Sequence, residues 1–465
     1  MSAPSAAALP VRGVERLAGW AADLTWEDIP ADVQQAAVTH FVDAYGVALA
    51  ASRTPFGRGL LDGLDDVDEG SALVVGSSRR VDPMRAAVLN GTLVHGLEYD
   101  DTHIPSIVHG SGVALAAALS QAHRPGTTAG DLLTAFVITW EAMIRLGLLA
   151  PGAYQARGFQ TAAVTGAPAA ALAVGRLRGL APSVLAEALA IATSFASGLM
   201  AYAFDGATVK RAHLGWAAHG GVAAVDLATA GITGPGRPLT SRFGFLQVIG
   251  GQDTHDDAAI SAILDDVGER WHLRDAAYKL YPVCHYIHSY LDIVEEIRSL
   301  HALDDIGSIE CVVHPAVTNV ISDDPELRRR PTTFEQAQYS LHYTVAQMFA
   351  RGSCDLDALV ADLGDDRVLE VADRVVAIVN PDLEFPGVFP AFIRLRDRDG
   401  AVLEERSIVG PRGATLSGDA LGPELRDKFI RNVSSGMDPA AAAARFERMT
   451  DLGGLASEPA STWLA

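Results

Sequence analysis

The densest group of chemically reactive side chains lies between residues 98 and 109. Its members are Glu98, Asp100, Asp101, Thr102, His103 and His109. Carboxylates and imidazoles at this density can carry out general acid–base chemistry, in which a positioned side chain moves a proton to or from a substrate. The structural alternative is that an aspartate caps a helix and the histidines are solvated. A metal site is disfavoured, because the spacing fits no established ligand pattern.

A second group places two cations ahead of an alanine-rich segment. It contains Lys210, Arg211 and His213. Because the N-terminus of a helix favours anions, cations beside one can form a receptor for a carboxylate. The structural alternative is that these cations only solvate a loop.

A third group, residues 279–288, contains Lys279, Cys284 and His288. A buried histidine is more often a satisfied core residue than a catalyst. The presence of two histidines close to a cysteine shifts that balance only modestly. We therefore treat this group as a secondary candidate for substrate binding.

Several other types of site have no support in the sequence. Ser111 is not part of a G-x-S-x-G motif, and neither a G-x-G-x-x-G nor a Walker pattern occurs. The cysteines Cys284, Cys311 and Cys354 are widely spaced and form no C-x-x-C pair, which disfavours a disulfide framework and an iron–sulfur cluster. We therefore expect no metal, dinucleotide or ATP site.

The elements that must position these groups are mostly helices in the first 270 residues. Apolar side chains in Ala37–Leu49 recur at the spacing of an amphipathic helix. Similar spacing predicts helices at Ser111–His123, Asp131–Leu148, Ala162–Leu177, Pro182–Ser197 and Gly215–Gly231. Their many alanines and glycines allow helix axes to approach closely. The group at residues 98–109 then falls on a loop that leads into the helix starting near Ser111.

From about residue 271 the pattern becomes mixed. Ser308–Val320 and Arg374–Val379 are β-branched runs that predict strands, and Ala391–Ile408 predicts a hairpin. Helices are predicted at Phe334–Arg351, Asp355–Leu363, Pro423–Val433 and Pro439–Met449. We expect a mainly α protein with a large all-helical domain, residues 1–270 and 406–465, and a smaller α+β domain, residues 271–405.

Composition limits the partners. The chain has 465 residues, of which 49% are hydrophobic, and its 57 acidic and 36 basic residues give a net charge of −21. Such a charge disfavours nucleic acid and anionic membranes as partners. Met1–Leu9 lacks the cationic start of a secretory signal, and the apolar stretch Ala162–Val174 falls short of the roughly 18 residues of a membrane span. We expect a soluble, cytoplasmic protein.

Taken together and in this order, the groups resemble the MmgE/PrpD family, which includes 2-methylcitrate dehydratase, cis-aconitate decarboxylase and iminodisuccinate epimerase. The resemblance rests on six ordered blocks at residues 90–103, 109–111, 158–166, 210–219, 279–288 and 338–343. It implies a helical domain closed by both chain termini and an inserted α+β lid. It also implies a homodimer and catalysis without a metal or an organic cofactor.

The resemblance also implies roles for single residues. Glu98, Thr102 and His109 match an acidic residue, a threonine and a histidine that line the site in the decarboxylase branch. Lys210 matches the family lysine, and Tyr343 matches a tyrosine of the lid.

Four positions depart from the decarboxylase pattern. Glu98 replaces an aspartate, Gln160 replaces a histidine, and Gly110 replaces a proline. Cys284 stands where a site histidine is usual, while His288 matches a later histidine of that motif. These differences disfavour cis-aconitate decarboxylation itself.

The resulting hypothesis is a cofactor-free lyase that dehydrates a di- or tricarboxylate. The residues expected to act in catalysis are His109, Lys210, Asp100, Asp101, Thr102 and His103. Those expected to bind substrate are Glu98, Gln160, Arg211, His213, Lys279, Cys284, His288 and Tyr343. An epimerase is the first alternative and a decarboxylase the next. A homologue that binds a carboxylate without catalysis is the alternative from a different class.

Overall fold

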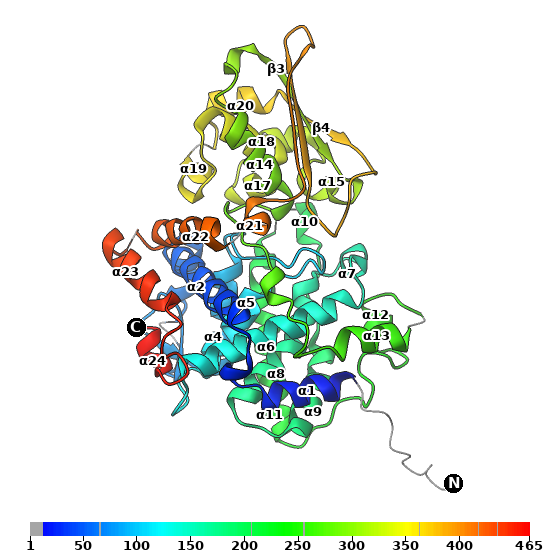
Figure 1. The fold of residues 1–465 in the computed structure, drawn as a ribbon, viewed down its shortest axis with the longest axis vertical. Helices are drawn as coiled ribbons and strands as arrows, with labels where there is room; N and C mark the ends of the chain where they lie inside the picture. Colours follow the sequence, from blue (N-terminus) through cyan, green and yellow to red (C-terminus); the bar gives the residue numbers. More distant parts are fainter. Residues whose placement is uncertain are drawn as a thin grey trace.

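A computed structural model describes residues 13–64, 67–205, 207–253, 256–361, 363–416, 418–434 and 436–465 (Figure 1). The segment Met1–Leu9, considered above for a secretory signal, lies outside the described residues. Figure 1 shows a large helical body and, above it, a smaller body that carries a β-sheet.

The helical body is arranged around α5 (Ser111–Gln121), in which every residue is buried. Helices α4, α6, α8 and α11 pack against it. The longer helices of this body are α1 (Gly13–Asp23), α2 (Ala31–Arg53), α4 (Pro83–His95), α6 (Ala129–Leu148), α8 (Thr161–Leu177), α9 (Pro182–Ala192) and α11 (His213–Thr229). The short helices are α3 (Pro55–Asp62), α7 (Ala153–Ala156), α10 (Tyr202–Asp205), α12 (Phe245–Val248) and α13 (Asp257–Leu264). This body also contains a small hairpin of β1 (Ala72–Leu73) and β2 (Arg80–Val81).

The sequence predicts these long helices well, because their apolar spacing is regular. The predicted start near Ser111 is confirmed. The predicted helix Pro182–Ser197 is too long, since α9 ends at Ala192 and a 3₁₀ turn follows. The apolar stretch Ala162–Val174 is buried inside α8. Within the described ranges no helix is both long and apolar enough to cross a membrane.

Two glycines allow α4 and α11 to touch. A Cβ atom on Gly91 would lie 2.5 Å from Cα of Gly215, and one on Gly215 would lie 2.1 Å from the carbonyl oxygen of Val88. No larger residue fits at either position without moving a helix. The contact brings the segment before α11, which carries Lys210, towards the segment after α4, which carries Glu98.

Gly215→Ala is therefore expected to lower the free energy of unfolding by about 1–3 kcal/mol, because overpacking forces the two backbones apart. Urea denaturation followed by circular dichroism measures this change. Gly19→Ala is the matched control, since a Cβ there meets no atom within 4 Å and the residue lies in α1. Equal stability of the two variants would contradict the close approach.

The smaller body, which we call the lid, contains a four-stranded sheet in the order β4-β3-β5-β6. Strand β3 (Ile306–Val313) pairs parallel to β4 (Val375–Val379) and antiparallel to β5 (Ala391–Asp397), which forms the predicted hairpin with β6 (Val402–Ile408). The lid helices are α14 (His285–Ile297), α15 (Pro315–Ile321), α16 (Pro325–Arg329), α17 (Phe334–Gln338), α18 (Leu341–Arg351), α19 (Leu356–Ala361) and α20 (Asp366–Ala372). Helices α14 and α18 pack together and contact the sheet.

Two predictions for the lid are wrong in the same way. The run Ser308–Val320 is not one strand, because β3 ends at Val313 and Pro315 begins α15, where its missing N–H costs nothing. The run Phe334–Arg351 is not one helix. It breaks before Ser340, whose hydroxyl accepts a hydrogen bond from the Tyr343 N–H at 2.9 Å and so caps α18.

The chain then returns to the helical body through α21 (Arg412–Thr415), α22 (Gly418–Val433), α23 (Pro439–Thr450) and α24 (Ala460–Trp463). Figure 1 shows α22 and α23 beside α2. The mainly α architecture with a small sheet is thus confirmed. The exact domain limits at residues 270 and 405 stay a prediction.

Candidate active site

The loop between α4 and α5 carries the first group of reactive residues, and it is buried rather than solvated. Its backbone is tied to the start of the lid, because the N–H groups of Thr102 and Ala277 donate to each other's carbonyls at 2.9 and 2.8 Å. Glu98 has a φ of +53°. A side-chain-bearing residue in this left-handed conformation is strained, and such strain persists only where surrounding contacts fix it.

Those contacts come from lysines. The chain has only three lysines, Lys210, Lys279 and Lys428, and all three lie at this loop. Lys210 donates to Oε1 of Glu98, and Lys279 donates to its Oε2 at 3.3 Å and to its carbonyl oxygen at 3.0 Å. Burial alone would raise the pKa of Glu98, but the two ammonium groups hold it well below its ordinary value. Two cations facing one carboxylate leave positive charge for a further anion.

Lys428 performs a different task. Its ammonium group is fully buried between Asp43 of α2, at 2.8 Å from Oδ1, and the carbonyl oxygen of Tyr99, at 2.9 Å. Through Lys428, helix α22 therefore links Tyr99, the residue after Glu98, to α2 of the helical body. The sequence prediction missed this residue, although the scarcity of lysine could have singled it out.

A tyrosine completes the surroundings of Lys210. The ammonium nitrogen of Lys210 lies 2.5 Å from the hydroxyl of Tyr339, which occupies the break between α17 and α18. Burial raises the pKa of Tyr339 well above its ordinary value, and the charge of Glu98 adds to the effect. The phenol is therefore protonated at neutral pH. Tyr343, chosen from the sequence, instead lies one turn further along, buried in α18.

One ring nitrogen of His109 contacts two neighbouring residues of the same loop. Its Nδ1 lies 2.9 Å from the carbonyl oxygen of Asp101 and 3.0 Å from the hydroxyl of Thr102. Because a carbonyl can only accept, Nδ1 carries the proton and Nε2 has a free lone pair. Burial lowers the pKa of His109 to about 3, against the opposing charge of Asp100. The ring is therefore neutral at pH 7, and the residue is half-buried.

Gln160 joins two further histidines. Nδ1 of His95 donates to Asp100 at 2.8 Å, so its Nε2 accepts from the amide nitrogen of Gln160 at 2.9 Å. The amide oxygen of Gln160 then accepts from Nδ1 of His213 at 2.8 Å. Gln160 cannot act as an acid or base, but its amide fixes the tautomers of both rings. His95 is a second residue that the sequence prediction missed.

The carboxylate of Asp101 connects the loop to α2 and α5. Its Oδ2 is 2.5 Å from Nδ1 of His40 and accepts a hydrogen bond from the Ser111 hydroxyl at 2.6 Å. The indole N–H of Trp140 donates to the same hydroxyl at 3.1 Å. The carboxylate of Asp101 thus orients His40 rather than His109.

The lid contributes Cys284, the N-cap residue of α14. Burial raises the pKa of its thiol, while the nearby charges of Lys279 and Lys210 oppose the rise. The backbone here is joined to the helical body by Gln338, whose amide nitrogen donates to the carbonyls of Leu97 and Pro282 at 2.6 and 2.7 Å.

Three sequence candidates have their polar contacts elsewhere. His103 bonds the Ser106 hydroxyl at 2.8 Å, and Arg211 forms an ion pair with Glu335. His288 lies in the lid core with its Nε2 3.3 Å from the carbonyl of Val283. The spacing of these residues in the sequence could not reveal which partners they contact.

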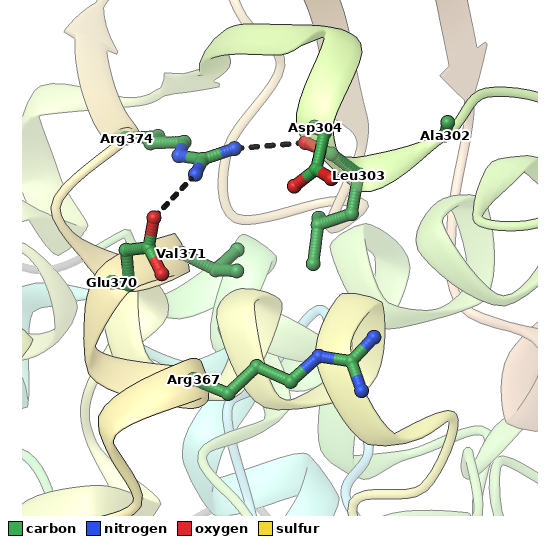
Figure 2. Close-up of a pocket in the computed structure, with 7 residues that line it drawn as sticks. All are labelled: Ala302, Leu303, Asp304, Arg367, Glu370, Val371 and Arg374. Atoms are coloured by element: carbon green, nitrogen blue, oxygen red, sulfur yellow. Dashed lines mark hydrogen bonds and ion pairs between the residues drawn. The ribbon is translucent and has the colours of Figure 1, made fainter.

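A separate pocket of about 390 Å³ lies in the lid, lined by Ala302, Leu303, Asp304, Arg367, Glu370, Val371 and Arg374 (Figure 2). Figure 2 shows Arg374 between Glu370, at 2.9 Å, and the carbonyl of Leu303, at 2.8 Å. Its charge is thus already compensated, and the pocket contains none of the residues around Glu98. Among the described residues, no group of three or more His, Cys, Asp or Glu side chains is placed to hold a metal ion.

Several named proteins are similar to this chain over most of its length. The cis-aconitate decarboxylase-like protein oryM of Aspergillus oryzae is 29% identical over 445 residues, which cover 91% of this chain and 90% of oryM. A cis-aconitate decarboxylase of Aspergillus terreus is 26% identical over 90% of this chain and 92% of its own length. The cis-aconitate decarboxylase of Homo sapiens is 27% identical over 76% of this chain and 73% of its own length.

Family models give the more general result. The model of the MmgE/PrpD N-terminal domain matches residues 15–257, and the model of the MmgE/PrpD C-terminal domain matches residues 281–452. The two matches cover both the helical body and the lid. The chain therefore belongs to the MmgE/PrpD family.

Proposed function

We propose that this protein is a lyase that removes carbon dioxide from an unsaturated di- or tricarboxylate of the cis-aconitate type. The observation that carries the proposal is the convergence of Lys210 and Lys279 on Glu98, beside the neutral ring of His109. A substrate carboxylate can share the two ammonium groups with Glu98. The departures from the decarboxylase pattern at four positions leave Thr102, His109 and Lys210 in place. The names of the similar proteins support the choice of carbon dioxide as the leaving group.

The chemistry follows from these groups. When the bond to the departing carboxylate breaks, its electron pair enters the adjoining unsaturated carboxylate, and Lys210 and Lys279 stabilise the added negative charge. The carbon at the far end of the unsaturated system then takes one proton. An anion beside Nε2 of His109 favours protonation of that nitrogen, which can pass the proton to carbon. Overall, the substrate takes up one proton and loses one carboxylate group as carbon dioxide.

Dehydration, favoured by the sequence, is the second candidate, and the protonation state of His109 supports it. A neutral imidazole with a free Nε2 can remove a proton next to a carboxylate. The protonated hydroxyl of Tyr339, beside Lys210, can then assist the departure of a hydroxide. The same side chains would thus serve either reaction.

The two candidates can be separated with cis-aconitate labelled with ¹³C at each carboxyl. Decarboxylation predicts ¹³CO₂ in the headspace and an unsaturated dicarboxylate in solution. A hydro-lyase acting in reverse would add water and release no ¹³CO₂. Release of ¹³CO₂ at the rate of an enzyme-free sample, with cis-aconitate unchanged, would contradict the first proposal.

We further propose that two copies associate through the face that carries the cations. Three exposed apolar residues, Leu199, Val209 and Trp216, lie on the segment that leads into α11 and on its first turn, close to Lys210 in the sequence. Trp216 is 53% exposed and lies one turn after His213. Covering this face would shield the cations next to it from water.

Trp216→Asp is expected to convert a dimer into a monomer, because a charge is costly to bury in an apolar interface. Size-exclusion chromatography with light scattering measures the mass. Val409→Asp is the matched control, since Val409 is 74% exposed but lies at the end of the lid hairpin. A monomeric unsubstituted protein, or a dimer that tolerates Trp216→Asp, would contradict the proposal.

A further inference from the structure

His285 is the most unusual polar side chain that the site described above does not use. It is the first residue of α14 and is only 3% exposed. Within the described part of the chain, neither of its ring nitrogens has a hydrogen-bond partner. Buried polar groups are nearly always hydrogen-bonded, so two orphaned nitrogens on one ring require an explanation.

The position of the ring gives that explanation. The imidazole contacts the ring of Phe389, with the centroids 5.6 Å apart, and that of His288, at 4.7 Å. Burial, helped by the neighbouring His288 and by the charge of Lys279, lowers the pKa of His285 well below its ordinary value, so the ring is neutral. A neutral imidazole offers one N–H donor and one lone pair.

The N-terminus of α14 lies at the same place. This helix has 13 residues, and its N-cap is Cys284, whose thiol pKa is raised by burial and by Glu98 and lowered by Lys279 and Lys210. Helix N-termini favour anions, since their first N–H groups point outwards and the helix dipole is positive there. The backbone places this N-terminus beside the loop that the lysines hold, because Gln338 donates both to the carbonyl of Pro282, two residues before Cys284, and to the carbonyl of Leu97, the residue before Glu98.

Building on the proposed function, we propose that His285 donates a hydrogen bond to a carboxylate oxygen of the bound substrate. The start of α14 then binds a second substrate carboxylate, apart from the one between Lys210 and Lys279. Substrates with a single carboxylate lack this contact and bind more weakly.

The test compares His285→Leu with the unsubstituted full-length protein. The probe is tricarballylate, a saturated tricarboxylate that has no double bond to react, and binding is measured by calorimetry. Loss of one hydrogen bond to a carboxylate is expected to weaken binding roughly 10-fold or more. The melting temperature without ligand is expected to rise, because Leu removes the buried orphaned nitrogens. His285→Asn, which keeps a donor, is expected to recover part of the affinity.

His342→Leu is the matched control. His342 is also buried, with an orphaned Nδ1, but it lies in α18 beside Arg328 and Arg329. It is expected to leave tricarballylate binding unchanged. A His285→Leu variant that binds tricarballylate as tightly as the unsubstituted protein, or that melts lower and binds no differently from His342→Leu, would overturn the inference.

The outcomes also separate this inference from the proposed reaction. Tight binding of tricarballylate that depends on His285, without turnover of cis-aconitate, would support the inference and contradict the lyase. Turnover of cis-aconitate with the same KM in His285→Leu would support the lyase and contradict the inference. Absence of tricarballylate binding to the unsubstituted protein would contradict the inference, whatever the reaction.

Discussion

His109→Gln is expected to lower kcat for the true substrate by roughly 10²–10⁴-fold, the range for loss of a positioned acid or base. Glutamine can still donate to the carbonyl of Asp101, which now holds Nδ1 at 2.9 Å, so the loop should keep its shape. It cannot carry a proton to or from carbon. Steady-state kinetics on cis-aconitate or the best member of a carboxylate panel measures the loss.

His103→Gln is the matched control, because this histidine lies on the same loop and faces Ser106 instead of the lysines. It is expected to retain kcat within a few-fold. If both variants lost activity equally, the loop would matter only for folding, and the role of His109 would be wrong. Unchanged activity in His109→Gln would contradict it more directly.

The pH dependence distinguishes the two uses of His109. In the free enzyme its pKa is about 3, so the ring is neutral at pH 7. Decarboxylation requires the ring to gain a proton after the substrate binds, so kcat/KM should fall between pH 7 and 9, by up to about 10-fold per unit. Dehydration requires the ring without that proton, so kcat/KM should stay level there. The substrate carboxyl groups are fully ionised over most of this range and do not obscure the result.

Lys210→Met is expected to lower kcat by roughly 10²–10³-fold, by analogy with the loss of one preorganised donor at a developing anion. Methionine keeps much of the side-chain volume but removes the charge that Glu98 and Tyr339 now share. Lys279 alone would then hold Glu98, and the pKa of that carboxyl should rise. Kinetics and binding of tricarballylate together show whether charge stabilisation or binding is lost.

Arg211→Met is the control for Lys210→Met. Arg211 is the next residue along the chain, but its guanidinium pairs with Glu335 and stacks on the ring of Phe56, 4.5 Å from the ring centroid. Removing this neighbouring cation is expected to change kcat little. Equal losses in the two variants would show that general positive charge, rather than the position of Lys210, supports the reaction.

The helices were predictable because their information is local. Helices such as α6 and α8 follow from the apolar spacing of their own residues, and the β5–β6 hairpin follows from its turn. The failures occur where a single residue overrides the pattern. Pro315 turns a β-branched run into a helix, and the cap at Ser340 divides one predicted helix into two.

The site was predictable at the level of its groups but not of every contact. Glu98, His109, Lys210 and Lys279 do come together as the three sequence groups imply. Which partner each of these side chains contacts depends on packing between residues far apart in the sequence. The break before α18 brings Tyr339 rather than Tyr343 to Lys210. The return of the C-terminal helices likewise brings Lys428, 329 residues further along the chain, to the carbonyl of Tyr99.

The most direct test of the central claim is proton NMR of the full-length protein in D₂O with cis-aconitate, 2-methylcitrate and amino-dicarboxylates. If His109 and the paired lysines transfer a proton at carbon, deuterium should appear on a carbon next to a carboxylate or at the far end of an unsaturated acid. The same spectra should show the loss of carbon dioxide, or of water for the second candidate. His103→Gln should behave alike and His109→Gln should not. A panel in which no member gains deuterium or loses either fragment, although tricarballylate binds, would contradict the lyase and leave a carboxylate-binding protein.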